Sequence, residues 1–354
     1  MTNMQNIKAG PVPGGLRNIE IGRLLLEGRA FFALIVIVAV FSALSPNYFT
    51  LGNFLTMASH VAIFGILAVG MLLVILNGGI DLSVGSTLGL CGVVAGFLMQ
   101  GVTVGGYTLY PPVWVVAVLT CVFGALIGLV NGVLVARFKV PAFVATLGVM
   151  YVARGAALLI TNGLTYNNLG GKPALGNTGF DWLGFNHVFS VPIGVIVLAV
   201  IAIVANVVLA RTAFGRWLYA SGGNERAAEL AGVPVKRVQV SVYALSGLCA
   251  AIAGLILSSQ LTSAGPTAGL SYELTAIAAV VIGGAALTGG RGTLRGTMLG
   301  AFVIGFLSDG LVIVGISSYW QTVFTGAVIV LAVLLNAVQY KRRPKKLPKN
   351  AVPA

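Results

Sequence analysis

Residues 59–99 read SHVAIFGILAVGMLLVILNGGIDLSVGSTLGLCGVVAGFLM, which is two long apolar runs separated by a short break. The break contains Asn77-Gly78-Gly79 and, one residue later, Asp81. Each run has close to the 20 residues that an α-helix needs to cross the hydrocarbon core of a bilayer. The glycine pair and Asp81 interrupt the start of the second run, so it is either an ordinary span or a broken or re-entrant one. This stretch therefore predicts membrane helices.

The composition of the whole chain agrees with this prediction. Of its 354 residues, 58% are apolar and only 8% are charged. Soluble domains carry about 25% charged residues, so 8% cannot cover the surface of a soluble enzyme. The 48 glycines have no regular period and are typical of membrane helices whose backbones approach closely. We expect an all-α, polytopic membrane protein.

The same length criterion divides the rest of the chain. We expect about ten transmembrane helices in one membrane domain over 30–338, preceded by a polar segment at 1–29 and followed by a basic tail at 339–354. Glycine spacings such as Gly124/Gly128/Gly132 predict helix-packing faces. The apolar runs are 30–44, 59–77, 80–99, 113–136, 141–161, 189–210, 238–259, 272–288, 296–314 and 320–338.

The distribution of basic residues gives the orientation. With the N-terminus in the cytoplasm, 19 of the 21 Lys and Arg residues fall in segments that ten spans place inside, as the positive-inside rule requires. Both termini are therefore predicted to be cytoplasmic, with the tail near anionic lipid. The net charge of +13 lies in short clusters between spans, which argues against nucleic acid as a partner. Those segments are 1–29, 137–140, 211–237, 289–295 and 339–354.

Two stretches about 205 residues apart share a pattern. Residues 78–85 and 283–290 both read Gly-Gly-x-x-Leu-Ser/Thr-x-Gly, each at the predicted cytoplasmic end of a span. Glycine-interrupted helices in corresponding positions point to a transporter pathway, although glycine pairs also recur by chance in a glycine-rich chain. We interpret the pair as a parallel internal repeat, with structural glycines at Gly78, Gly79, Gly283 and Gly284.

Polar residues inside spans are costly and usually face the protein interior or a water-filled path. Asp81 has two possible roles: capping the helix that begins near Ser83, which we favour, or contacting a transported solute. Arg154 either snorkels outward or pairs with a membrane carboxylate, and Asn131 is expected to bridge helices. Candidate pathway residues are Asn77, Asp81, Ser83, Asn131, Thr146 and Glu273, and Arg154 and Asp309 also lie within spans.

Catalytic and metal sites are not expected. The cysteines Cys91, Cys121 and Cys249 have no metal-ligand spacing and are typical of small buried residues. His60 and His187 are isolated in the sequence, so we expect no histidine-based site. An intramembrane enzyme is correspondingly disfavoured.

The predicted inside loop 211–237 contains a short helix. Asn224 is a good N-cap, residues 227–231 favour helix, and Gly232 followed by Pro234 ends it. Such a short helix is marginal in water alone, so we expect it to dock into a partner through its Ala/Leu face, with Gly232 left-handed and Ala228 on the docked side.

These residues resemble a known family. Ala227-Ala228-x-x-x-Gly232 is similar to the EAA coupling loop of ABC importer permeases, although Glu225 stands one residue earlier than the acid of that loop. The chain from about 45 to 338 resembles the ribose-type monosaccharide permeases. That resemblance rests on Gly78 to Ser86, Asn131-Gly132, Pro141 to Gly148, Gly222 to Val233 and Val281 to Gly284.

The resemblance implies a homodimeric permease in a bacterial inner membrane, driven by a separate ATPase and fed by a periplasmic sugar-binding protein. Glu225, Ala227, Ala228 and Gly232 are the implied ATPase-coupling residues. No G-x-x-x-x-G-K-S/T loop occurs in the chain, so ATP and Mg²⁺ are expected on the ATPase and no cofactor on this chain. A monosaccharide is the expected solute, with a polyol or a passive solute channel as alternatives.

Overall fold

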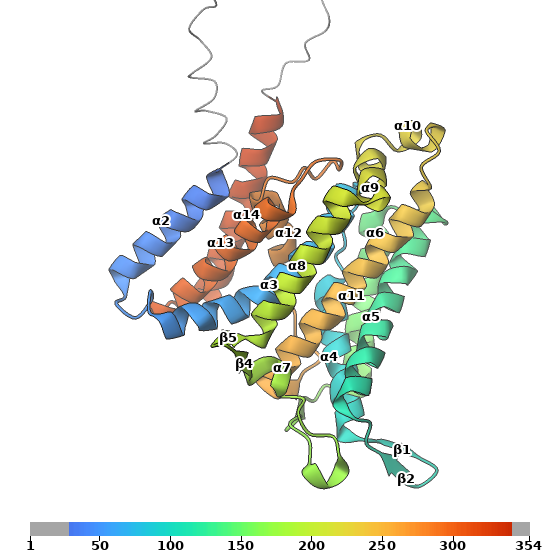
Figure 1. Cartoon of the computed structure of the whole chain (residues 1–354), viewed down its shortest axis with the longest axis vertical. Coiled ribbons are helices and arrows are strands. Elements are labelled where there is room, and N and C mark those ends of the chain that lie inside the picture. The colour runs from blue at the N-terminus through green and yellow to red at the C-terminus, as the bar shows by residue number, and fades with distance from the viewer. Residues whose placement is uncertain (1–27, 342–354) are drawn as a thin grey trace, which may run out of the picture.

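The computed structural model describes residues 28–341, and helices dominate them (Figure 1). The first half of the chain forms α2 (Arg29–Leu44), α3 (Leu51–Leu76), α4 (Val84–Gln100), α5 (Val113–Ala136) and α6 (Ala142–Thr161). The second half forms α8 (Ile193–Arg211), α9 (Ala213–Gly223), α10 (Glu225–Leu230), α11 (Val235–Leu261), α12 (Tyr272–Ile282), α13 (Leu294–Ile313) and α14 (Ser318–Lys341). The all-α prediction is confirmed. Most of the predicted polar segment 1–29 and of the predicted tail 339–354, namely 1–27 and 342–354, lies outside the described residues.

The remaining elements are short pieces between the long helices. They comprise three antiparallel strand pairs, one 3₁₀ turn and a four-residue helix. These are β1 (Val102–Val104) with β2 (Tyr107–Leu109), β3 (Tyr166–Asn167) with β6 (Ser263–Ala264), β4 (His187–Val188) with β5 (Val191–Pro192), η1 (Pro173–Leu175) and α7 (Trp182–Phe185).

Every predicted apolar run contains a helix, but several boundaries differ from the prediction; α3, for example, begins at Leu51 and not near residue 59. By length and composition, α3, α5, α6, α8, α11 and α13 suffice to cross a membrane, whereas α2, α4 and α12 are shorter apolar helices. The run 80–99 is an uninterrupted helix from Val84, and only 77–83 is irregular. The run 272–288 is helical only as far as Ile282. The inside loop also holds a second helix, α9, which the sequence pattern did not indicate.

The ends of the helices sort to two ends of the molecule. Figure 1 shows α9 and α10 at the same end as the start of α2 and the end of α14, whereas the β1–β2 hairpin and α7 lie at the opposite end. The described chain therefore begins and ends at the end of the molecule that carries α9 and α10.

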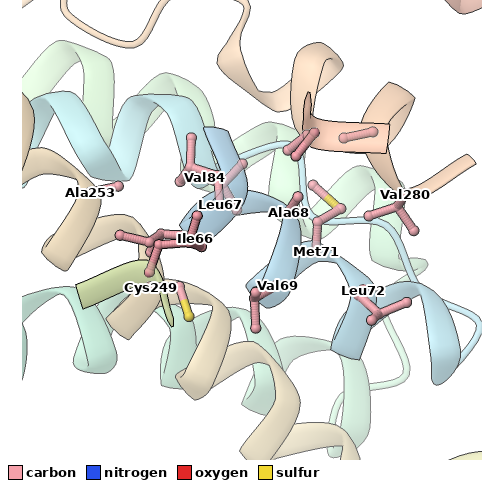
Figure 2. Packing of buried hydrophobic residues seen from close by; sticks show 14 of the residues in the cluster. Ile66, Leu67, Ala68, Val69, Met71, Leu72, Val84, Cys249, Ala253 and Val280 are labelled. Carbon is pink, nitrogen blue, oxygen red and sulfur yellow. The ribbon is translucent and has the colours of Figure 1, made fainter. Parts of the chain in front are cut away.

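The core is built around α3. Its residues from Val61 to Leu76 are almost all buried, as expected for a helix that is apolar on every face. Figure 2 shows Ile66, Leu67 and Met71 of α3 packed among side chains of α4, α11 and α12. Large apolar side chains of α2, α5, α6 and α8 instead lie exposed on the outside.

Glycines permit the closest helix contacts. A Cβ at Gly128 of α5 would collide with the backbone oxygen of Tyr243 in α11, and one at Gly124 would collide with Ala251 and Gly247. The predicted packing role of these glycines is confirmed. Their close contact holds α5, which carries Asn131, against α11, which carries Ser246.

Candidate functional site

Two glycine-rich breaks, residues 77–83 after α3 and 283–293 after α12, end the helices that precede them in the same way. Gly78 has φ +84° and Gly79 donates its N–H to the Val74 oxygen at 3.0 Å, while Gly284 has φ +92° and Ala285 donates to the Val280 oxygen at 3.1 Å. Both are glycine-terminated helix ends of the Schellman type. The structural counterpart of Gly78 is therefore Gly284, one residue later than the sequence pattern aligned it.

The other glycine of each pair allows a close approach. A Cβ on Gly79 would collide with the Tyr243 hydroxyl, and one on Gly283 would collide with Gly296 of α13. All four glycines thus have local structural reasons for being glycine.

The C-terminal end of α9 contacts both breaks at once. Gly290 donates its N–H to the Leu76 oxygen at 2.9 Å, and Gly222 lies against that same carbonyl. The Ser221 hydroxyl donates to Asn77 Oδ1 at 3.0 Å, and the Tyr219 hydroxyl donates to the Gly292 oxygen at 2.9 Å. Because α9 continues into α10 after one residue, the two breaks and α10 form one connected junction.

A buried polar network fixes the irregular segment 77–83. Asp81 is 1% exposed, and its Oδ1 accepts from the Ser83 N–H at 3.0 Å and the Ser83 hydroxyl at 2.6 Å. The Ser246 hydroxyl of α11 donates to Asp81 Oδ2 at 2.9 Å, and Asn131 of α5 donates to the Ser83 hydroxyl at 2.8 Å. Thr146 of α6 donates to the Ile80 oxygen at 3.2 Å.

This network brings together four predicted pathway residues: Asp81, Ser83, Asn131 and Thr146. All four are buried, so in this conformation none presents a side chain to a solute. Asp81 accepts from the N–H of Ser83, the residue that precedes α4, in a local turn. Among the described residues, no side chain caps the first turn of α4, so the carboxylate has a structural role in segment 77–83 but makes no N-cap hydrogen bond to the helix. Asn131 bridges helices as expected.

Glu273 and Arg154 lie elsewhere and remain partly exposed. Arg154 donates from Nη1 to the backbone oxygens of Pro266 and Ala268, at 2.6 and 2.8 Å. Neither predicted role of Arg154 describes this arrangement, because its partners are carbonyls of the irregular segment 265–271. No ion pair joins it to a carboxylate within the described part of the chain.

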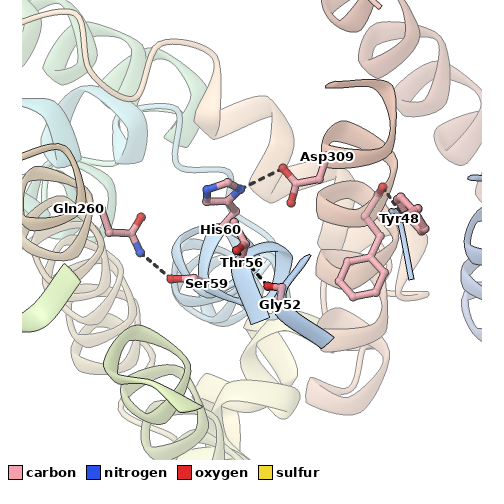
Figure 3. Close-up of polar contacts among 8 residues, drawn as sticks. Tyr48, Gly52, Thr56, Ser59, His60, Gln260 and Asp309 are labelled. Carbon is pink, nitrogen blue, oxygen red and sulfur yellow. Dashed lines mark hydrogen bonds and ion pairs between the residues drawn. The ribbon is translucent and has the colours of Figure 1, made fainter. Parts of the chain in front are cut away.

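His60, which is isolated in the sequence, has a carboxylate partner in the structure. Its Nδ1 lies 3.0 Å from Asp309 Oδ1, and Gln260 donates to the Ser59 hydroxyl at 2.9 Å beside it (Figure 3). These contacts join α3 to α13 and α11. Residues about 200 or more positions apart leave no spacing signal, which is why sequence reasoning missed the pair. Between residues 28 and 341, no group of three potential metal ligands is present.

The helix α10 has the predicted ends. Asn224 Oδ1 accepts from the Ala227 N–H at 3.0 Å, and Gly232 has φ +81°. Ala228, however, is only 5% exposed and lies on the inner face, whereas Leu230 is 85% exposed. The placement of Ala228 on the docked side is therefore wrong: it anchors α10 to its own subunit, and Leu230 is the apolar side chain that α10 presents outward.

Glu225 has a partner within its own chain. Its Oε1 lies 3.4 Å from Lys139 Nζ in the turn between α5 and α6, and both side chains are about half exposed. We expect Glu225→Gln to lower ATP-driven uptake by less than about fivefold, because an exposed ion pair contributes only about 0–1 kcal/mol. Uptake by membrane vesicles checks this, and complete loss of uptake would contradict it.

Comparisons with known proteins identify the class. The model of the family described as branched-chain amino acid transport system / permease component matches residues 53–333. The chain belongs to this family of transport permeases, and it is a multi-pass protein of the bacterial inner membrane.

Individual relatives narrow the class further. The chain is 44% identical to the ribose import permease protein of Escherichia coli strain K12 over 88% of this chain and 94% of that protein. It is 41% identical to the ribose import permease protein of Haemophilus influenzae, over 90% and 95% of the two chains. Identity to the xylose transport system permease protein of Escherichia coli strain K12 is 33%, over 96% and 99%. No solved structure matches the chain significantly.

Proposed function

We propose that this chain is the membrane subunit of an ABC importer for a monosaccharide, with ribose as the first solute to test. The observation that carries the proposal is the near full-length similarity to ribose and xylose import permeases. The description of the family names branched-chain amino acids instead, so these are the rival solutes. A polyol remains a sugar-like alternative.

We assign ATP hydrolysis and the capture of the solute to other chains. We propose a homodimeric permease, with ATP and Mg²⁺ bound by a separate ATPase and the sugar delivered by a periplasmic binding protein. The junction supports this assignment, because α10 is mostly exposed and is joined through α9 to both helix breaks. Docking of the ATPase on Leu230 and its neighbours would move α9 and thereby the breaks, which is the kind of rigid-body switch that alternating access requires.

Transport by the assembled importer tests the function. We expect right-side-out vesicles containing the permease, its ATPase and its binding protein to take up labelled ribose only when ATP is supplied inside. Inside-out vesicles with the same proteins serve as the control and should take up no ribose. Labelled xylose, ribitol and leucine complete the series. Leucine uptake without sugar uptake would overturn the proposal, and ATP-independent sugar uptake would favour a passive channel.

The orientation is tested separately. We propose that the end bearing α9 and α10 faces the cytoplasm and that the segment 162–188 faces outward. In a background with the three native cysteines replaced by alanine, Lys172→Cys should react with an impermeant maleimide in intact cells and Arg226→Cys should react only after permeabilisation. Labelling of Arg226→Cys in intact cells would contradict this orientation.

A further inference from the structure

The irregular segment 265–271 packs against α4 and is partly exposed. It follows β6 and precedes α12, and its backbone contacts α4: a Cβ at Gly89 would collide with the Ala268 oxygen, and one at Gly85 with the Gly269 oxygen. The helix α12 has only 11 residues, about 16 Å, or roughly half of the 30 Å hydrocarbon core. With the junction at the cytoplasmic surface, as proposed above, α12 begins near the middle of the membrane.

Two opposite charges stand at this mid-membrane position. Glu273, in the first turn of α12, places Oε2 against Gly85, while Arg154 of α6 places Nη1 against Gly89, one turn further along α4. The two attract each other electrostatically, but no ion pair within 4.0 Å joins them. Both are partly exposed on the subunit surface.

This surface cannot face lipid. Placing a charged side chain in the hydrocarbon core costs at least about 2.5 kcal/mol, so such residues face a water-filled cavity or protein. The hydrogen bonds of Arg154 use Nη1 alone, which leaves the donors on Nε and Nη2 for a ligand. The Glu273 carboxylate offers acceptors about one helical turn away.

An aromatic ring completes the group. Tyr151 lies three residues before Arg154 on α6, hence on the same helix face, and is 69% exposed. A guanidinium that donates, a carboxylate that accepts and an exposed ring together suit a solute that carries hydroxyl groups on an apolar carbon skeleton.

We propose that Tyr151, Arg154 and Glu273 form a hydroxyl-recognising site that the monosaccharide occupies midway through its passage. This inference rests on the proposed function. The gap between the carboxylate and the guanidinium receives sugar hydroxyls, and the Arg154–carbonyl bonds hold the segment 265–271 in place beside it.

Two variants test the site without disturbing the Arg154 anchor. Tyr151→Ala removes an exposed ring, and Glu273→Gln keeps the size of the side chain while removing its charge. With saturating sugar-loaded binding protein, we expect each to lower the maximal uptake rate at least tenfold while ATP hydrolysis stimulated by the loaded binding protein is retained. We also expect the ratio of ribose to xylose uptake to change, an effect that a merely structural role would not produce.

Matched controls come from the same chain. Tyr319→Ala removes another exposed tyrosine and Asp181→Asn neutralises an exposed carboxylate of the outer segment, and both should transport like the wild type. Normal uptake and an unchanged sugar ratio in both site variants, at wild-type abundance, would overturn the site while leaving the proposed function intact. So would loss of folded protein in both, since that assigns the residues to folding. Leucine uptake without sugar uptake by the wild type would overturn both proposals.

Discussion

Gly222→Ala should abolish ATP-driven uptake, whereas Gly223→Ala should leave it close to wild type. A Cβ at Gly222 would collide with the Leu76 carbonyl oxygen and also crowd the Gly290 N–H, while one at Gly223 would meet nothing within 4 Å. Both neighbours of Gly222 are backbone atoms at helix breaks, so no side chain can rotate away. Overpacking of this kind costs typically about 1–3 kcal/mol, and relief requires α9 to separate from the breaks.

The measurement pairs uptake with assembly. Vesicles containing each variant are assayed for ribose uptake, and the ATPase that co-purifies with each is quantified. We expect Gly222→Ala to retain the ATPase, because α10 is unchanged, and to lose uptake by more than tenfold. Full uptake with Gly222→Ala would show that the contact between α9 and the breaks has no part in coupling.

Asp81→Leu should prevent accumulation of the folded permease, whereas Asp81→Asn should accumulate normally. Leucine leaves the Ser83 N–H and the hydroxyls of Ser83 and Ser246 without their buried acceptor, and each such loss costs about 1–3 kcal/mol. The sum approaches the 5–15 kcal/mol that stabilises a typical protein. Asparagine keeps Oδ1 for Ser83, and the Ser246 hydroxyl can turn to accept from Nδ2.

Abundance and transport separate the two roles of Asp81. Membrane levels of each variant are measured by immunoblot, and uptake is normalised to them. Ser246→Ala is the intermediate case, since it leaves Asp81 with two hydrogen bonds but removes the donor to Oδ2; we expect its abundance to lie between those of Asp81→Asn and Asp81→Leu. Loss of normalised uptake by Asp81→Asn at normal abundance would contradict a purely structural role and give the charge a direct part in the pathway.

Local chemistry made much of the fold predictable. The apolar runs locate the long helices, the cap at Asn224 and the left-handed Gly232 follow from residue preferences within one turn, and the spacing of Gly124 and Gly128 marks a packing face. These features depend on neighbours in sequence, so the chain itself specifies them.

What could not be predicted depends on distant contacts. The pairing of His60 with Asp309 spans 249 positions, and the bonds of Arg154 to carbonyls near 266–268 span more than 110. Which face of α10 is inward depends on the packing of α9, a helix that the sequence pattern did not reveal. The four buried residues Asp81, Ser83, Asn131 and Thr146 were individually identified as polar residues in spans, but only their contacts show that they form a structural network.

The short α12 behaves geometrically as a lever. The turn that follows it is clamped to α3 through the Gly290–Leu76 bond, and its other end carries Glu273 beside the segment that Arg154 holds. A helix about 16 Å long that tilts by about 10° about its C-terminal end displaces the far end by about 3 Å, comparable to the length of a hydrogen bond. A small tilt of α12 would thus suffice to make or break contacts around Glu273, without any unfolding of the helix itself.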